Sequence, residues 1–313
     1  MKVLSFNQHG ETRLGIFVDL NILDIQKAYS ICSENISPEI VEGIKTEGVF
    51  KDALSFIQSG EEGLKLANAI IEELHKKKIQ FESALLDFNS AHLEAPIKNP
   101  NKIICIGLNY ADHCKEQGIA PPQNPVIFSK FSTAIIGPGE DIIHPRITKQ
   151  LDYEGELAVI IGKMGKYIDR DNAVNFIFGY TILNDVTARD IPFSDGQWIR
   201  AKSFDTFAPI GPWIVTKDEI PNPNNLNIRT YVNGQISQNS NTKNMIFDIP
   251  YLLEFISSVF TLYPGDIIST GTPPGVGIYR DPPYFLHHSD EITIEIEKIG
   301  ELKNTVVEES MFA

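Results

Sequence analysis

The sequence predicts an α+β protein that is mainly β, with a small α/β domain at 1–95 and a larger β-rich domain at 96–313. Three observations support this. The 313 residues are about twice a usual domain length. Apolar residues recur at helical spacing over 50–77, whereas β-branched and aromatic runs dominate from Lys102 onward. Between these regions, the segment APIKNPN at 95–101 has the proline and asparagine content of a linker.

The first domain is expected to begin with short extended segments. These are MKVLSF, RLGIFVD and NILDIQKAY, with a turn between the last two at 19–21. Ser59 and Gly60 interrupt the helical pattern of 50–77, so two helices are expected there. The first domain therefore combines a small β element with helices.

The second domain is expected to consist mostly of strands. Its β-branched and aromatic runs, punctuated by glycine and proline, are KIICIGL, PVIFSKF, ELAVIIG, GYTILND, GPWIVT, NIRTYVNG, GDIISTG and EITIEIEKI. The clearest helical stretch covers 249–260. Because helices are few, a repeated βαβ pattern is disfavoured and a mixed or antiparallel sheet is expected.

Composition and charge exclude several classes of protein. The chain is 42% hydrophobic and 22% charged, which is typical of a folded globular protein. Its net charge of -14 predicts that neither nucleic acid nor an anionic membrane surface is a partner. Cys32, Cys105 and Cys114 form no CxxC pair and are too few for a disulfide framework, which favours a reducing cytoplasm. The polar first residues and the lack of a long apolar run predict neither export nor a membrane span.

The most informative segment is LDYEGELAVIIGK, at 151–163. If it forms one strand, Asp152, Glu154 and Glu156 share a face, because side chains alternate with a period of two. No basic residue precedes Lys163 in this segment, so the carboxylates repel one another unless a cation or proton neutralises them. The segment alone favours the simpler alternative, an acidic strand exposed to solvent.

A second acidic position follows the apolar strand in FIFGYTILNDVTARD, which ends at Asn184 and Asp185. Asp185 could complete a set of three carboxylates. Three oxygen anions suit Mg²⁺ or Mn²⁺ better than Zn²⁺ and leave positions for water or substrate. An equally plausible role for Asp185 is the N-cap of a helix over 186–189.

The segment GLNYADHCKEQG places His113 and Glu116 on one face of any helix formed there. A carboxylate beside an imidazole orients it and raises its basicity, as a general base toward water requires. The commoner origin of this spacing is a solvated helix face. Lys202 and Arg189 could bind a substrate carboxylate, although surface charge is the simpler interpretation. Cys105 is expected in the core, and Cys114 needs no role.

Several familiar site motifs are absent from the sequence. It contains no GxxxxGK[ST] loop, GxGxxG fingerprint, GxSxG elbow or HExxH pair. The segment GTPPGVG at 271–277 lacks the lysine and the following helix of a nucleotide loop. We therefore interpret it as a tight turn.

Six segments together resemble, in chain order, the motifs of the fumarylacetoacetate hydrolase superfamily. They are KIICIGLNYADH, LDYEGELAVIIGK, GYTILNDVTARD, AKSFDTFAPIGPW, NGQISQNSNTKNMIFDIPYLLEFIS and GDIISTGTPPGVG. The resemblance covers about residues 100–305. It implies a mixed β-roll catalytic domain, usually in a homodimer. The first 95 residues are similar to the smaller, variable N-terminal domain of many bacterial members.

The resemblance also implies a metal site and a catalytic dyad. Glu154, Glu156 and Asp185 would hold Mg²⁺ or Mn²⁺. His113 and Glu116 would lie on a short lid that becomes ordered when ligand binds, and together they would activate a water molecule.

Further residues are implied as substrate contacts. Lys202 would contact the substrate or the developing oxyanion, Thr272 is similar to the family's contact to the substrate carboxylate, and Arg189 is another candidate. Many members place a glutamine three residues after this arginine, where this chain has Pro192. Gln197 is the nearby residue that could replace it.

The resemblance narrows the expected chemistry. Asn109 stands where the namesake fumarylacetoacetases have an additional aspartate, so the site is similar to that of acylpyruvases, oxaloacetate decarboxylases and related isomerases. We expect metal-dependent carbon–carbon cleavage in a small 2-oxo or 2,4-dioxo acid, by hydrolysis or decarboxylation through a stabilised enolate. The alternatives are an isomerase or tautomerase of hydroxymuconate-type ring-cleavage products, and a metabolite-binding scaffold with little catalysis.

Overall fold

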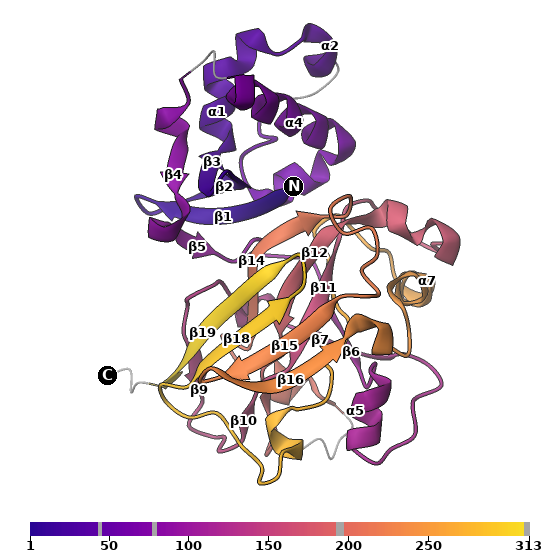
Figure 1. Ribbon diagram of the computed structural model, residues 1–313. Coiled ribbons are helices and arrows are strands. Elements are labelled where there is room, and N and C mark those ends of the chain that lie inside the picture. The colour runs from indigo at the N-terminus through magenta and orange to yellow at the C-terminus, as the bar shows by residue number, and fades with distance from the viewer. Residues whose placement is uncertain (43–45, 77–79, 192–196, 310–313) are drawn as a thin grey trace.

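The computed structural model describes residues 1–42, 46–76, 80–191 and 197–309. A smaller N-terminal part lies at one end of a larger β-rich part (Figure 1). The N-terminal strands are β1 (Lys2–Gln8), β2 (Glu11–Val18), β3 (Asn21–Asp24), β4 (Leu85–Asp87) and β5 (His92–Glu94). The helices of this part are α1 (Ile25–Cys32), α2 (Pro38–Val41), α3 (Ala53–Gln58) and α4 (Gly60–Lys76).

Local sequence signals explain most of the N-terminal part. The expected turn joins β2 to β3, and Asp19 and Leu20 both have positive φ there, as a tight hairpin turn requires. The expected break between two helices is also confirmed, because α3 ends at Gln58 and α4 begins at Gly60. The extended interpretation of NILDIQKAY is wrong beyond Asp24, because the Asp24 carboxylate accepts a hydrogen bond from Lys27 N at 3.1 Å and caps α1.

The larger part contains every strand run expected from the sequence. Its strands are β6 (Ile103–Gly107), β7 (Val126–Lys130), β8 (Ile135–Ile136), β9 (Ile142–His144), β10 (Leu151–Asp152), β11 (Gly155–Ile161), β12 (Ile177–Asn184), β13 (Thr187–Ala188), β14 (Ala208–Thr216), β15 (Asn227–Val232), β16 (Gln235–Asn241), β17 (Ile267–Ser269), β18 (Glu291–Ile296) and β19 (Gly300–Glu308). Its helices are α5 (Ala111–Glu116), α6 (Ile199–Lys202) and α7 (Ile249–Val259). The predominance of strand confirms the predicted α+β, mainly β class.

Two large sheets organise the molecule. The main path of the first is β4-β3-β2-β1-β14-β12-β11-β17-β6-β7, and the second has the order β16-β15-β18-β19-β9. Both contain parallel and antiparallel pairs, as expected. The first sheet is continuous between the two parts, because β1 pairs with β14. That 1–95 and 96–313 are two separate domains therefore stays a prediction.

Both faces of the first sheet are covered by apolar side chains. Ala158 and Ile160 of β11 belong to the cluster that includes Phe56 of α3, whereas Val159 belongs to the cluster that includes Leu252 of α7. This alternation follows from the period of two in a strand. The strands that lead to the candidate site are thus fixed on both faces.

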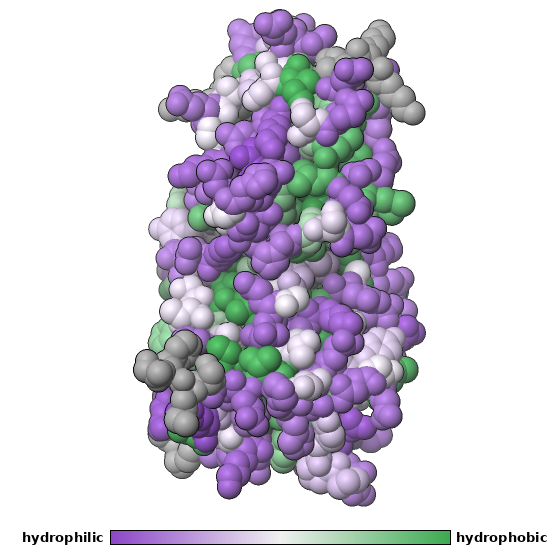
Figure 2. Space-filling model, turned by 90° about the vertical axis from the view of Figure 1, so that its left-hand side faces the viewer, coloured by the Kyte–Doolittle hydropathy of each residue, from purple (hydrophilic) through white to green (hydrophobic). Residues whose placement is uncertain are grey.

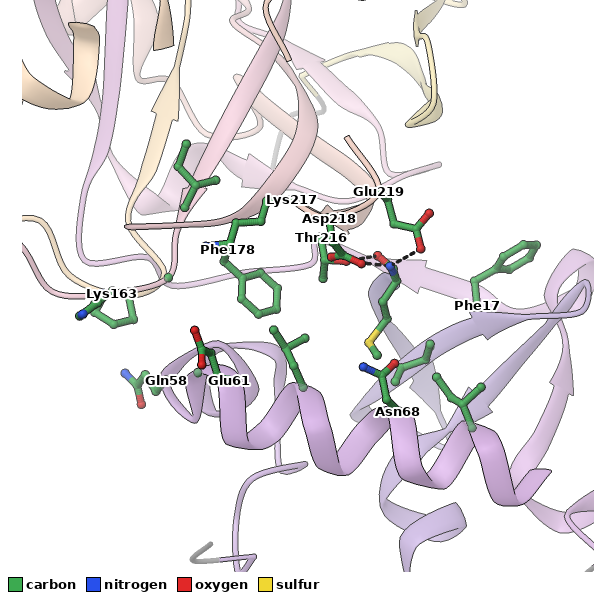
Figure 3. A pocket seen from close by; sticks show the side chains of 18 of the residues that line it. Phe17, Gln58, Glu61, Asn68, Lys163, Phe178, Thr216, Lys217, Asp218 and Glu219 are labelled. Atoms are coloured by element: carbon green, nitrogen blue, oxygen red, sulfur yellow. Dashed lines mark hydrogen bonds and ion pairs between the residues drawn. The ribbon is translucent and has the colours of Figure 1, made fainter. Parts of the chain in front are cut away.

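A cleft of about 990 Å³ lies between α4 and the sheet of the larger part (Figure 3). Its apolar lining includes Phe178 and Leu64, and charged side chains such as Glu61, Lys163 and Lys217 also line it. The carboxylate groups described below do not line this cleft. It is therefore not the candidate site, although it is larger than the cavity there.

One face of the molecule is mostly hydrophilic, with separate hydrophobic areas in both parts (Figure 2). Among the described residues, no helix combines the length and the apolar character needed to cross a membrane.

Candidate active site

Three buried carboxylates meet where two neighbouring strands end. Glu154 immediately precedes β11, Glu156 lies within it, and Asp185 directly follows β12. The two strands are antiparallel with Gly155 opposite Asn184, so the start of β11 and the end of β12 lie side by side. One carboxylate oxygen from each residue lies within 4.8 Å of the others. The structure thus brings together the three residues that were expected to hold a metal.

The expectation of one continuous strand over 151–163 is wrong. The strand is interrupted at Tyr153, whose backbone N–H donates to the Asp152 carboxylate at 2.8 Å. Asp152 therefore lies apart from the three clustered carboxylates, in β10. The alternative of an exposed acidic strand is also wrong, because Asp152, Glu154 and Glu156 are all buried. The helix N-cap alternative for Asp185 fails because β13 follows it.

Basic side chains from other elements neutralise this cluster. Lys202 Nζ lies 2.7 Å from Glu154 and 2.8 Å from Asp185. Lys130 Nζ lies 2.6 Å from the other oxygen of Asp185. Arg189 pairs with Glu154 at 2.7 Å. The interpretation of Lys202 and Arg189 as surface charges is wrong, because both side chains are largely buried.

The two glutamates experience different electrostatic environments. Burial disfavours the charged form of Glu154, but Lys202 and Arg189 outweigh it and lower the pKa to about 2. Burial, reinforced by Asp185 and Glu154, raises the pKa of Glu156 well above its usual range. Glu156 accepts hydrogen bonds only from the neutral Ser269 hydroxyl and the backbone N–H of Gly271 among its described bonds. Glu156 therefore has no cationic hydrogen-bond partner among the described residues, in contrast to Glu154.

The chemistry of the donor set fits a divalent cation. Carboxylate oxygens are the ligands that Mg²⁺ and Mn²⁺ prefer, and three of them leave coordination positions for water or substrate. Glu154, Glu156 and Asp185 would hold the ion, which would also supply the positive charge that Glu156 lacks.

The expected dyad is assembled on α5. His113 Nδ1 lies 2.9 Å from the Glu116 carboxylate. The other Glu116 oxygen accepts a hydrogen bond from the backbone N–H of Gly275 at 2.9 Å. His113 is only 6% exposed, so the interpretation of this spacing as a solvated helix face is wrong. Glu116 therefore orients the imidazole and is itself fixed by the 271–277 segment.

A cavity of about 210 Å³ joins the dyad to the carboxylate cluster. Its lining comprises Ile106, Gly107, Leu108, His113, Gln117, Phe128, Glu154, Glu156, Arg189, Trp198, Lys202, Thr272 and Tyr279. The predicted residues His113, Arg189, Lys202 and Thr272 thus face one small space. Gln197 is exposed and does not line this cavity, and Pro192 lies outside the described residues.

The segment that contains Thr272 is an irregular loop with a bend at Pro274, followed by the 3-10 helix Gly277–Tyr279 rather than by an α-helix. The Thr272 hydroxyl donates to the carbonyl oxygen of Gly155 at 3.0 Å and accepts from Gln238 Nε2 at 2.8 Å. These bonds fix Thr272 beside the backbone of β11. Asn109 is buried and bonds to the backbone of Phe247 and Thr270 rather than to the carboxylates.

Sequence reasoning missed Lys130, Gln117 and Tyr279, and it named Asp152 only as one of three acidic residues on a strand face. Lys130 neutralises Asp185, and Asp152 accepts a hydrogen bond from Arg189 Nε at 2.8 Å. Gln117 and Tyr279 line the cavity beside His113. Gln117 was detectable, because it follows His113 by four residues at helical spacing. Lys130 and Tyr279 depend on contacts between distant segments and have no comparable local signal, and the same is true of the contact between Asp152 and Arg189.

The sequence and the fold match known proteins. The family model described as fumarylacetoacetate (FAA) hydrolase C-terminal matches residues 102–307. The mitochondrial oxaloacetate tautomerase Fahd2a of Rattus norvegicus is 46% identical over 258 residues, which are 82% of this chain and 80% of that protein.

Two solved structures extend the likeness over the whole chain. The fumarylacetoacetate hydrolase of Exiguobacterium antarcticum has 36% identity and a TM-score of 0.80, covering 99% of this chain and 100% of that one. The maleylpyruvate hydrolase of Sphingobium sp. SYK-6, in complex with manganese (II) ion and pyruvate, has 30% identity and a TM-score of 0.76 with the same coverage. With the motifs, the clustered carboxylates and the fold in agreement, the chain belongs to the fumarylacetoacetate hydrolase family.

Proposed function

We propose that this enzyme is a Mg²⁺- or Mn²⁺-dependent tautomerase that interconverts the enol and keto forms of a small oxaloacetate-type acid. The observation that carries the proposal is that His113, oriented by Glu116, lines the same small cavity as Glu154 and Glu156. The similarity to an oxaloacetate tautomerase supports this choice over the other reactions of the family. The complete dyad disfavours the scaffold alternative.

Different residues would bind the cation and the substrate. Glu154, Glu156 and Asp185 would hold the divalent cation, which when bound would polarise the carboxylate and oxo oxygens of the substrate. Arg189, Lys202 and Thr272 line the cavity. Their positive and hydroxyl groups would orient a second carboxylate of the substrate.

The proton transfer follows from the dyad. Glu116 accepts a hydrogen bond from the N–H group at His113 Nδ1, so the lone pair of Nε2 serves as the base. In the enol-to-keto direction, His113 Nε2 takes the proton of the enol hydroxyl and then delivers a proton to C3, which returns the imidazole to its neutral form. The carbon–carbon double bond becomes a carbon–oxygen double bond, and no atom is gained or lost. The same residues catalyse the reverse reaction.

A second candidate is hydrolytic carbon–carbon cleavage, which the manganese- and pyruvate-bound maleylpyruvate hydrolase favours. Here His113 would deprotonate a water that attacks the distal carbonyl of a 2,4-dioxo acid. The C3–C4 bond then breaks, giving a carboxylic acid and the enolate of pyruvate, which takes up a proton. Decarboxylation of oxaloacetate would use the cation without an attacking water.

The test measures the fate of enol-oxaloacetate and acetylpyruvate with purified enzyme, in Mg²⁺, Mn²⁺ or EDTA. We expect accelerated loss of the enol without loss of carbon, abolished by EDTA and by Glu154→Gln. His113→Ala should also abolish it, whereas His92→Ala, at an exposed histidine, should not. Pyruvate and acetate as the main catalysed products would favour cleavage. Full turnover by Glu154→Gln would contradict both candidates.

The homodimer implied by the resemblance stays a proposal, as does the cytoplasmic location. Light scattering of the purified chain over a range of concentrations tests the homodimer.

A further inference from the structure

The cavity-facing nitrogen of His113 already has a hydrogen-bond partner. Gln117, the C-cap residue of α5, places its amide Nε2 2.7 Å from His113 Nε2. The carbonyl oxygen of the same amide accepts a hydrogen bond from the Tyr279 hydroxyl at 3.1 Å. Both Gln117 and Tyr279 line the cavity. The amide therefore occupies the position from which a water molecule would donate to the base.

The orientation of this amide follows from the hydrogen bonds around it. Glu116 can only accept, so the neutral imidazole carries its proton on Nδ1 and presents a lone pair at Nε2. Of the two ends of the Gln117 amide, the NH₂ group is the one that can donate a hydrogen bond to that lone pair. With the amide reversed, its carbonyl oxygen would face the lone pair, and two acceptors would repel each other.

A small ligand and a water molecule would compete differently with this amide. A substrate that is anchored on the carboxylate-cluster side can displace the amide from His113 using its own binding free energy. A single water molecule has no such anchor, and it would have to replace a hydrogen bond that is already made. The amide lines the cavity of about 210 Å³, so it borders the space that a substrate and a water molecule would share.

We propose that Gln117, held by Tyr279, is a positioning residue that caps His113 and keeps hydrolytic water away from it. The cap biases the site toward proton transfer and against hydrolysis. The claim that the cap favours proton transfer over hydrolysis rests on the proposed function. The claim that Gln117 covers His113 does not. In the hydrolysis that the cap suppresses, one water and one 2,4-dioxo acid give one carboxylic acid and one pyruvate.

The first test measures access to His113 without metal or substrate. Diethyl pyrocarbonate acylates the unprotonated ring nitrogen of histidine, and mass spectrometry of peptides reports the rate at His113. We expect Gln117→Leu to raise this rate about fivefold, the factor that corresponds to one hydrogen bond of about 1 kcal/mol. Tyr279→Phe, which keeps the amide but removes its anchor, should produce a smaller increase. Gln123→Leu, at an exposed glutamine on the same connection, should match the unmodified enzyme.

The second test measures the ratio of acetylpyruvate hydrolysis to enol-oxaloacetate tautomerisation in the metal-loaded variants. We expect Gln117→Leu to raise the ratio about fivefold and Tyr279→Phe to raise it less. A loss of stability would lower both rates together and leave the ratio unchanged. If Gln117→Leu does not fold, Tyr279→Phe provides the same comparison.

The outcomes separate the two proposals. An unchanged acylation rate at His113 in both variants overturns the cap, whatever the enzyme catalyses. Increased acylation with an unchanged product ratio overturns the bias. An unmodified enzyme that does not tautomerise enol-oxaloacetate overturns the proposed function, and the acylation rates still decide whether the cap exists.

Discussion

Lys130 Nζ lies 2.6 Å from the Oδ1 atom of Asp185, and neither side chain is exposed to solvent. The second oxygen of Asp185 faces Lys202 at 2.8 Å, so two lysines share one carboxylate. Burial lowers the pKa of Lys130 despite the attraction of Asp185. The two lysines thus occupy both oxygens of Asp185 at the end of β12.

Replacing Lys130 by methionine should destabilise the enzyme. The change leaves one oxygen of a buried carboxylate without its cation, which costs about 3–5 kcal/mol. Urea unfolding in EDTA should show this loss relative to the unmodified enzyme. Lys149→Met, at an exposed lysine, is the control. Equal unfolding midpoints for Lys130→Met and the control would show that the pair contributes nothing.

Glu154→Gln and Glu156→Gln should separate structural from metal-binding roles. Glu154 pairs with Lys202 and Arg189, so its amide variant should unfold more readily in EDTA. Glu156 receives only neutral donors among its described hydrogen bonds, so its amide variant should keep the unfolding midpoint. Both should bind Mn²⁺ at least about tenfold more weakly by calorimetry. Unaltered Mn²⁺ affinity in Glu156→Gln would remove it from the ligand set.

The acid stability of the enzyme should depend partly on Glu94. Burial raises the pKa of this carboxyl, but hydrogen bonds from Thr12, Lys98 and Asn7 outweigh it and lower the pKa. A lowered folded-state pKa adds stability above the unfolded value of 4.5, and this stability is lost as the pH falls through the folded value.

Glu94→Gln should therefore flatten the decline of the urea midpoint as the pH falls from about 6 to 3. The variant and the unmodified enzyme should differ most above pH 5 and converge below it. Glu62→Gln, at an exposed glutamate, should follow the unmodified enzyme throughout. A parallel decline in Glu94→Gln would show that the carboxyl does not contribute to the acid transition.

The strands could be predicted from the sequence because their signal is local. Runs such as KIICIGL and ELAVIIG are rich in β-branched residues and lie between glycines or prolines. The end of β10 could not be predicted in this way. There the Asp152 side chain bonds to the backbone of Tyr153, Gly277 and Ile278, and the last two are distant in sequence.

The clustering of Glu154, Glu156 and Asp185 and the pairing of His113 with Glu116 could be predicted because spacing and family resemblance agree there. Their ion-pair partners could not be placed. Lys130 is 55 positions from Asp185, and nothing local to the PVIFSKF run shows which carboxylate it meets. Gln197 is exposed and does not line the cavity, and its role as a substrate contact stays a prediction.

Asp152→Asn should reduce turnover although Asp152 is not one of the clustered carboxylates. Its oxygens accept hydrogen bonds from Arg189 Nε and from the backbone N–H groups of Gly277 and Ile278. An asparagine NH₂ would face at least one of these donors, so Arg189 or the segment that carries Tyr279 must move. A displacement of about 1 Å costs on the order of 100-fold in rate. Asp169→Asn, at an exposed aspartate, is the control, and near-normal turnover by Asp152→Asn would show that Arg189 is positioned by Glu154 alone.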